Sequence, residues 1–319
     1  MPSATSGDFR PRVVVDEASF DFRELPDAAA EVALEQFNES LEALRDDRQV
    51  PAVCSLYAYV ECRDGMELHN LLYSRATEVD PDVCRRTGLL LDRCPAWDDD
   101  APAGCEPLDL PETPIVAFSV GFAFEMALSS RAVGCLVVPS CPRRDFRRLS
   151  RESSAADVLF FAEALEARRV WRHAYAVEDV AEHEFFAVAA FAFPSLVFHP
   201  GLQFGKFDGS YAAVRDPVVR ILSALDDHFP RVLAERQGLP SDIAAAMGQY
   251  GVDLSPESPN TRRSEALMRK REVAYSGTTY RCEWHAKVER HRNRIHFTLP
   301  TGGPGGCVLI GIFAEHLDV

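Results

Sequence analysis

The clearest alternation of apolar and polar residues lies near the C-terminus. Every second residue is apolar over 280–289, and residues 294–299 repeat the pattern. Successive side chains of a strand point to opposite faces, so this period predicts two β-strands. Folding them into a hairpin with both apolar faces on one side places Lys287 opposite His296.

The polar face of this hairpin carries the candidate chemistry. Metal-free RNA cleavage needs an acid, a base near neutral pH and cations for the phosphate, and imidazole, ammonium and guanidinium groups can supply all three. The candidate catalytic residues are His285, Lys287, Arg294 and His296, and the candidate nucleic-acid-binding residues are Arg290, His291 and Arg292. The alternative is the ordinary solvation of an exposed, charged sheet face.

Apolar residues elsewhere recur mostly at helical spacing. They predict helices over 26–45, 118–128, 155–169, 180–193, 213–236 and 241–248, and a buried strand over 132–138. Residues 251–264 are rich in Pro and Ser and predict a polar linker. The predicted class is α+β, with a mixed α/β body over 1–238 and a module over 239–319 that ends in a four-stranded antiparallel sheet.

Charge is distributed unevenly between these parts. The 319-residue chain has a formal net charge of -15, but residues 261–319 hold ten Lys/Arg against six Asp/Glu. The overall charge argues against nonspecific nucleic-acid binding by the whole molecule. An acidic body with a basic C-terminal module instead predicts RNA or another nucleic acid on the C-terminal face and a protein partner on the body.

The nine cysteines are widely spaced and mostly lie among apolar residues, as is typical of reduced thiols. Cys282 and His285 are spaced like half a zinc site, but on a strand their side chains diverge, so we expect no metal and no cofactor. The sequence shows no secretory signal and no membrane span, which predicts a cytoplasmic protein. Phosphate-loop, dinucleotide-binding and hydrolase motifs are absent.

The C-terminal module resembles the small bacterial toxins of the RelE/ParE superfamily. The residues that carry the resemblance are Arg294–Phe297 and 309–317, and the likeness covers about 239–319. The segments 255–258 and 285–287 also resemble a family of larger uncharacterised bacterial proteins. The RelE-type members cleave messenger RNA on the ribosome without metal through Lys, Arg and Tyr side chains, whereas ParE-type members bind gyrase. This chain has imidazoles in their place and a large acidic body.

Two hypotheses follow. The first is a metal-independent endoribonuclease-like toxin or phage-defence effector that acts on RNA through the His/Lys/Arg face of the sheet. The second is a nonenzymatic binding protein whose basic C-terminal face docks nucleic acid or an acidic protein.

Overall fold

The computed structural model describes residues 12–74, 77–98, 105–290 and 292–317. The chain forms two compact units, Met1–Glu178 (unit 1) and Asp179–Val319 (unit 2). Both contain helices and strands, which confirms the α+β class. The boundary lies at residue 178, not at residue 238 as predicted, because β7 (Leu196–Phe198) and α7 (Tyr211–Glu235) belong to the fold around the C-terminal sheet. No helix of the described residues is long and apolar enough to cross a membrane.

Unit 1 is built on a four-stranded sheet in the order β1–β4–β6–β5. Its strands are β1 (Val13–Val15), β4 (Gly134–Leu136), β5 (Asp145–Arg151) and β6 (Ser154–Phe161). The strands β1, β4 and β6 run parallel, and β1 and β4 are wholly buried, as continuous apolar sequence in a parallel sheet requires. The antiparallel strand β5 alternates exposed and half-buried residues, which suits the sheet edge.

Helices and one short hairpin complete unit 1. They are α1 (Asp27–Asp46), β2 (Glu61–Arg63), β3 (Met66–Glu67), α2 (Leu68–Tyr73), α3 (Pro81–Leu91), α4 (Phe118–Leu128) and α5 (Arg168–Val177). The helices predicted at 26–45 and 118–128 are confirmed. The helix predicted at 155–169 is wrong, because residues 154–161 pair with β4 and β5 as a strand.

Unit 2 contains a five-stranded mixed sheet in the order β7–β13–β12–β11–β8. The other strands are β8 (Leu254–Pro256), β11 (Trp284–Lys287), β12 (Arg294–Phe297) and β13 (Val308–Ala314). The predicted four-stranded antiparallel sheet is therefore wrong, since β7 runs parallel to β13 and β8 adds an edge. The sequence analysis assigned β8 to a polar linker because the segment is rich in Pro and Ser, although an edge strand tolerates Pro.

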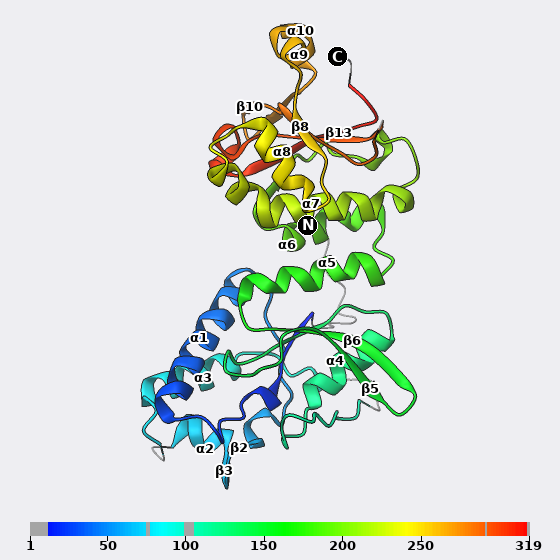
Figure 1. Ribbon diagram of the computed structural model, residues 1–319. Coiled ribbons are helices and arrows are strands. Elements are labelled where there is room, and N and C mark those ends of the chain that lie inside the picture. The colour runs from blue at the N-terminus through cyan, green and yellow to red at the C-terminus, as the bar shows by residue number, and fades with distance from the viewer. Residues whose placement is uncertain (1–11, 75–76, 99–104, 291, 318–319) are drawn as a thin grey trace. The chain divides into compact units, whose positions relative to one another are not determined.

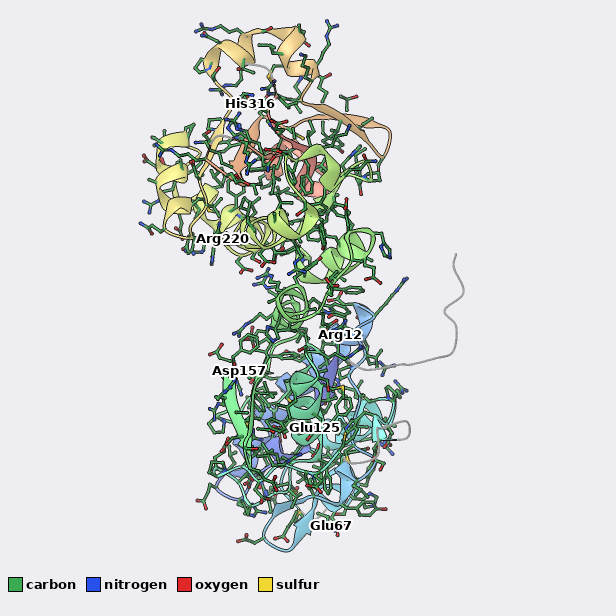
Figure 2. All side chains as sticks on the ribbon, turned by 90° about the vertical axis from the view of Figure 1, so that its right-hand side faces the viewer. Arg12, Glu67, Glu125, Asp157, Arg220 and His316 are labelled. Atoms are coloured by element: carbon green, nitrogen blue, oxygen red, sulfur yellow. The ribbon has the colours of Figure 1, made fainter. Side chains whose placement is uncertain are left out.

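The helices of unit 2 are α6 (Phe185–Ala192), α7 and α8 (Pro240–Gly248). The ring of Phe229 on α7 lies 6.0 Å from that of Trp284 and 5.4 Å from that of Phe297, so α7 packs on the apolar face of the hairpin. Figure 1 shows α7 running alongside the sheet of this unit. Charged side chains are exposed in both units (Figure 2). Examples are Glu67 and Asp157 in unit 1 and Arg220 in unit 2.

The hairpin register differs from the predicted one by two residues. Lys287 lies opposite Arg294, and His285 lies opposite His296. A shift of two residues keeps every side chain on its face, so the apolar pattern could not distinguish the registers. The connection decides between them: Asn293 is buried at φ 60° and exchanges two hydrogen bonds with the backbone of Asp208.

Two short helices, α9 (Pro259–Arg263) and α10 (Glu265–Arg269), lie together at one end of unit 2 (Figure 1). The hydroxyl groups of Ser258 and Ser264 cap their first turns. Residues 258–270, which include both helices, are called the basic lobe. A separate hairpin of β9 (Glu272–Tyr275) and β10 (Thr278–Arg281) follows it.

Candidate functional site

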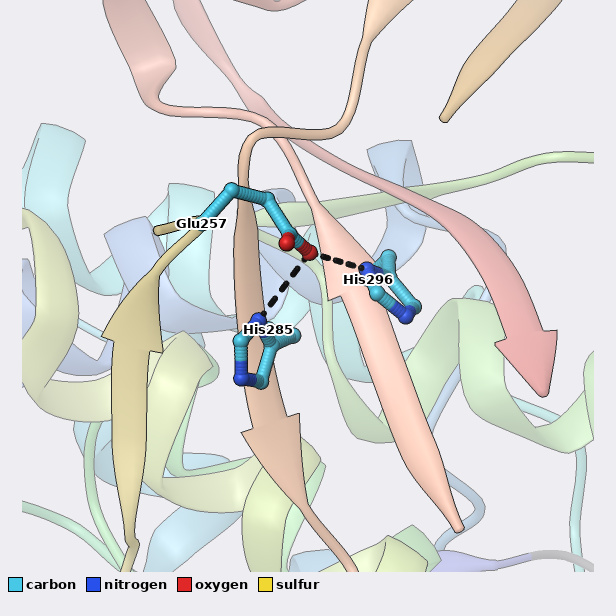
Figure 3. A group of neighbouring side chains, drawn as sticks. All are labelled: Glu257, His285 and His296. Carbon is cyan, nitrogen blue, oxygen red and sulfur yellow. Dashed lines mark hydrogen bonds and ion pairs between the residues drawn. The ribbon is translucent and has the colours of Figure 1, made fainter. Parts of the chain in front are cut away.

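Three neighbouring strands bring a carboxylate and two imidazoles together. Ser255 on β8, His285 on β11 and His296 on β12 are cross-strand partners, so they form one row across the sheet. Glu257 follows two residues after Ser255 and therefore returns to the same face. Figure 3 shows the carboxylate of Glu257 between the two imidazole rings.

Three side-chain nitrogen atoms lie close to one carboxylate oxygen of Glu257. The Oε1 atom of Glu257 lies 3.2 Å from Nδ1 of His285 and 3.3 Å from Nδ1 of His296 (Figure 3). It also lies 2.8 Å from Nε of Arg271, whose Nη1 donates to the carbonyl of Leu267 at 3.0 Å. These four side chains form the buried cluster, in which no residue exceeds 9% exposure.

Charge within the buried cluster is balanced. Burial opposes ionisation of Glu257, but the neighbouring imidazoles of His285 and His296 and the guanidinium of Arg271 outweigh it and hold the pKa of this carboxyl well below its usual range. Burial lowers the pKa of His296, although the Glu257 carboxylate partly opposes this. At neutral pH the cluster therefore combines an ionised carboxylate, a guanidinium and a neutral imidazole of His296.

The imidazole of His296 lacks hydrogen bonds. The residue is 1% exposed, and neither ring nitrogen has a hydrogen-bond partner among the described residues, since the Nδ1 contact with Glu257 does not meet hydrogen-bond geometry. An unsatisfied buried polar group costs about 1–3 kcal/mol. By contrast, Nε2 of His285 lies 3.3 Å from the hydroxyl oxygen of the half-buried Ser255. The ring of His296 is therefore the unexplained feature of the cluster.

The two imidazoles are not on the exposed face that the sequence predicted. His285 and His296 are 9% and 1% exposed, and that expectation is wrong because Glu257 and Arg271 cover this face of the sheet. In this arrangement neither imidazole is accessible to a polymer. The rings instead provide donor or ligand atoms inside the protein.

Of the remaining predicted residues, Lys287 and Arg294 form the cross-strand pair next to His285 and His296, on the same face of the hairpin. Lys287 pairs with Asp253 at 2.8 Å, and Arg294 is half-buried. Arg292 pairs with Asp208 and Glu289. Arg290 is exposed, and His291 lies outside the described residues. The four predicted catalytic residues therefore share one face of the hairpin, but the two imidazoles are buried and Lys287 is held by a carboxylate.

Sequence reasoning missed Glu257 and Arg271. Glu257 was assigned to the polar linker, although the order Leu254, Ser255, Pro256, Glu257 alternates apolar and polar residues as a strand does. Arg271 has no local signal, because its role depends on a carboxylate fourteen residues earlier in the sequence. Within the described residues, Glu257, His285 and His296 are the group that offers metal-ligand atoms within 4.8 Å of one another.

Comparisons with models of protein families, with curated proteins and with solved structures find no match to this chain. The resemblance of the C-terminal module to the RelE/ParE toxins therefore stays a prediction.

Proposed function

We propose that the protein binds RNA through the basic lobe of unit 2. The observation that carries this proposal is the charge of the surface of α9 and α10, which has four exposed basic residues and one acidic residue. The basic residues are Arg262, Arg263, Arg269 and Lys270, and the acidic residue is Glu265. Glu265 is moreover engaged by Arg281 at 2.7 Å.

The three exposed arginines of the basic lobe are not neutralised by other residues that the structure describes. No residue in the described part of the chain forms an ion pair with Arg262, Arg263 or Arg269. The hairpin differs, because Lys287 and Arg292 are both held by carboxylates. The lobe is therefore a better site for phosphate groups than the hairpin that the sequence favoured.

Arginine suits this partner for a physical reason. A guanidinium group presents a planar fork of donors that matches two phosphate oxygens, and it stays charged at every physiological pH. Three of the four exposed cations are arginines. Because the whole chain has a net charge of -15, we expect the electrostatic attraction of RNA to be confined to the basic lobe. The affinity for RNA is expected to fall steeply with salt concentration.

The geometry favours binding over cleavage. RNA cleavage requires a base within hydrogen-bond reach of the 2′-hydroxyl. The burial of His285 and His296 argues against that role for either imidazole. We therefore favour the hypothesis of a nonenzymatic RNA-binding protein, with the basic lobe as the surface that contacts RNA.

The test compares two charge-matched variants of the full-length protein. The first changes Arg262, Arg263 and Arg269 to Gln, and the control changes the exposed Arg85, Arg93 and Arg236 to Gln. Anisotropy of a fluorescent single-stranded RNA at low salt is expected to show at least tenfold weaker binding for the first variant only. Equal losses in both variants, or no RNA binding by the unchanged protein, would reject the proposal, and the second outcome would favour an acidic protein as partner.

A further inference from the structure

The nitrogen and oxygen atoms of the buried cluster are spaced like the ligands of one ion. Metal–nitrogen and metal–oxygen bonds of roughly 2.1 Å in tetrahedral geometry separate neighbouring ligand atoms by roughly 3.4 Å. The Oε1 atom of Glu257 lies 3.2 and 3.3 Å from the Nδ1 atoms of His285 and His296. All three residues come from one end of adjacent strands in a sheet, which holds their backbones in place.

The ring of His296 gives an independent indication. Its Nδ1 atom is buried, lies close to the carboxylate and makes no hydrogen bond, although a hydrogen bond would be the usual reason for such proximity. A metal ion near Glu257 and His285 would supply the missing partner. The ring of His285 is already oriented from its outer side by the hydroxyl group of Ser255, as metal-binding imidazoles commonly are.

Arg271 restricts the kind of ion. Its guanidinium group lies beside Glu257 and balances the single carboxylate, so the site has almost no net charge with which to attract a hard cation. Magnesium and calcium ions prefer several oxygen ligands, whereas zinc and its neighbours bind imidazole nitrogen strongly. The chemistry therefore selects a borderline transition metal.

We propose that Glu257, His285 and His296 bind one divalent transition-metal ion of the zinc type. Three protein ligands leave a fourth position for water or another small ligand. The site is separate from the proposed RNA contacts, but Glu257 and Arg271 flank the basic lobe on either side, so the ion would bind at the base of that lobe.

The experiment uses full-length protein that has been treated with a chelator and dialysed. Zinc is added, and its stoichiometry and affinity are measured by elemental analysis and by competition with a chromophoric chelator. We expect about one zinc per chain, unaffected by a hundredfold excess of magnesium. Glu257→Gln is expected to weaken binding by at least a hundredfold, and Ser255→Ala by about tenfold. His199→Gln is the matched control, because the hydrogen bonds of that ring within the described residues join it to backbone atoms of the same unit.

A second measurement needs no variant and so does not depend on variant folding. On addition of cobalt(II), the ring signals of His285 and His296 should shift and broaden in the NMR spectrum far more than those of His199. Absence of stoichiometric binding, equal binding by Glu257→Gln and the unchanged protein, or a thiolate charge-transfer band that reports cysteine ligands would each overturn the proposal.

Discussion

The guanidinium Nε of Arg271 lies 2.8 Å from Oε1 of Glu257, and these two residues flank the basic lobe. Both are almost completely buried, at 1% and 3% exposure. The exposed cations of the lobe are thus attached to the sheet through a buried ion pair. This relationship links the stability of the sheet to the position of its most basic segment.

Breaking this ion pair is expected to destabilise unit 2 strongly. Glu257→Gln removes the carboxylate that lies beside the buried Arg271 guanidinium, and removing one partner of a buried pair costs about 3–5 kcal/mol. Amide hydrogen exchange of β11 and β12 should report the loss. Glu265→Gln, which breaks an exposed pair with Arg281, is the control and should change little. Equal protection in the two variants would contradict this account.

Unit 2 is expected to lose stability on acidification. The folded pKa of Glu257 lies below its ordinary value of 4.5, and that of His296 lies below 6.5. The unfolded chain therefore binds protons first as the pH falls, initially at His296 below about 6.5 and then at Glu257 below about 4.5. Protection of β12 amides should decrease across this window. In His296→Gln, the loss between pH 6.5 and 5 should be smaller, and an unchanged loss would exclude His296 as its source.

The contribution of Glu17 to the stability of unit 1 is expected to respond to pH in the opposite sense. Burial and the neighbouring Asp16 raise the pKa of Glu17 to about 7, although hydrogen bonds from Ser119 partly oppose this. The folded state therefore binds the proton more tightly, and its contribution is complete below 4.5 and declines as the pH rises through 7. A shift of this size corresponds to about 3 kcal/mol. Glu17→Gln should make β1 and β4 more resistant to exchange at pH 8 than in the unchanged protein, and no gain there would contradict the buried carboxylate.

Two helical glycines are expected to respond oppositely to alanine. A Cβ atom at Gly121 of α4 would lie 2.2 Å from the carbonyl oxygen of Glu106, which is backbone and cannot move freely. Gly248 at the end of α8 has nothing within 4 Å of its Cβ position. Gly248→Ala should therefore stabilise its helix by about 0.5–1 kcal/mol, whereas Gly121→Ala should destabilise unit 1. Thermal unfolding of both variants checks the opposite signs.

The salt dependence of RNA binding separates the lobe from the hairpin. With three or four phosphate contacts on a single strand, log affinity should fall against log salt with a slope of about -2 to -3. Arg263→Gln should reduce the slope by about 0.7. Arg292→Gln should leave it unchanged, because Asp208 and Glu289 already hold that guanidinium. A larger change of slope for Arg292→Gln than for Arg263→Gln would indicate that RNA contacts the hairpin and not the basic lobe.

The sequence by itself determined the elements whose pattern is local. The helices α1 and α7 repeat apolar residues at helical spacing, α4 is almost continuously apolar and β12 alternates, so each was predicted close to its observed bounds. The single strand predicted over 280–289 is wrong, because the structure divides this range between β10 and β11. The burial of Trp284 and Phe297 followed from the same alternation. Local patterns sufficed here because the apolar residues of these elements pack in the core.

Tertiary structure alone decided the rest. The register of the hairpin depends on Asn293 and its contacts with Asp208, and the strand β6 depends on pairing with β4, neither of which a local period encodes. The polar face of the hairpin was expected to be exposed to solvent. Alternation shows that the two faces of a strand differ in polarity, but it does not show which other segments cover each face. Glu257 and Arg271 bury that face only once β8 pairs with β11 and the basic lobe returns the chain to the sheet.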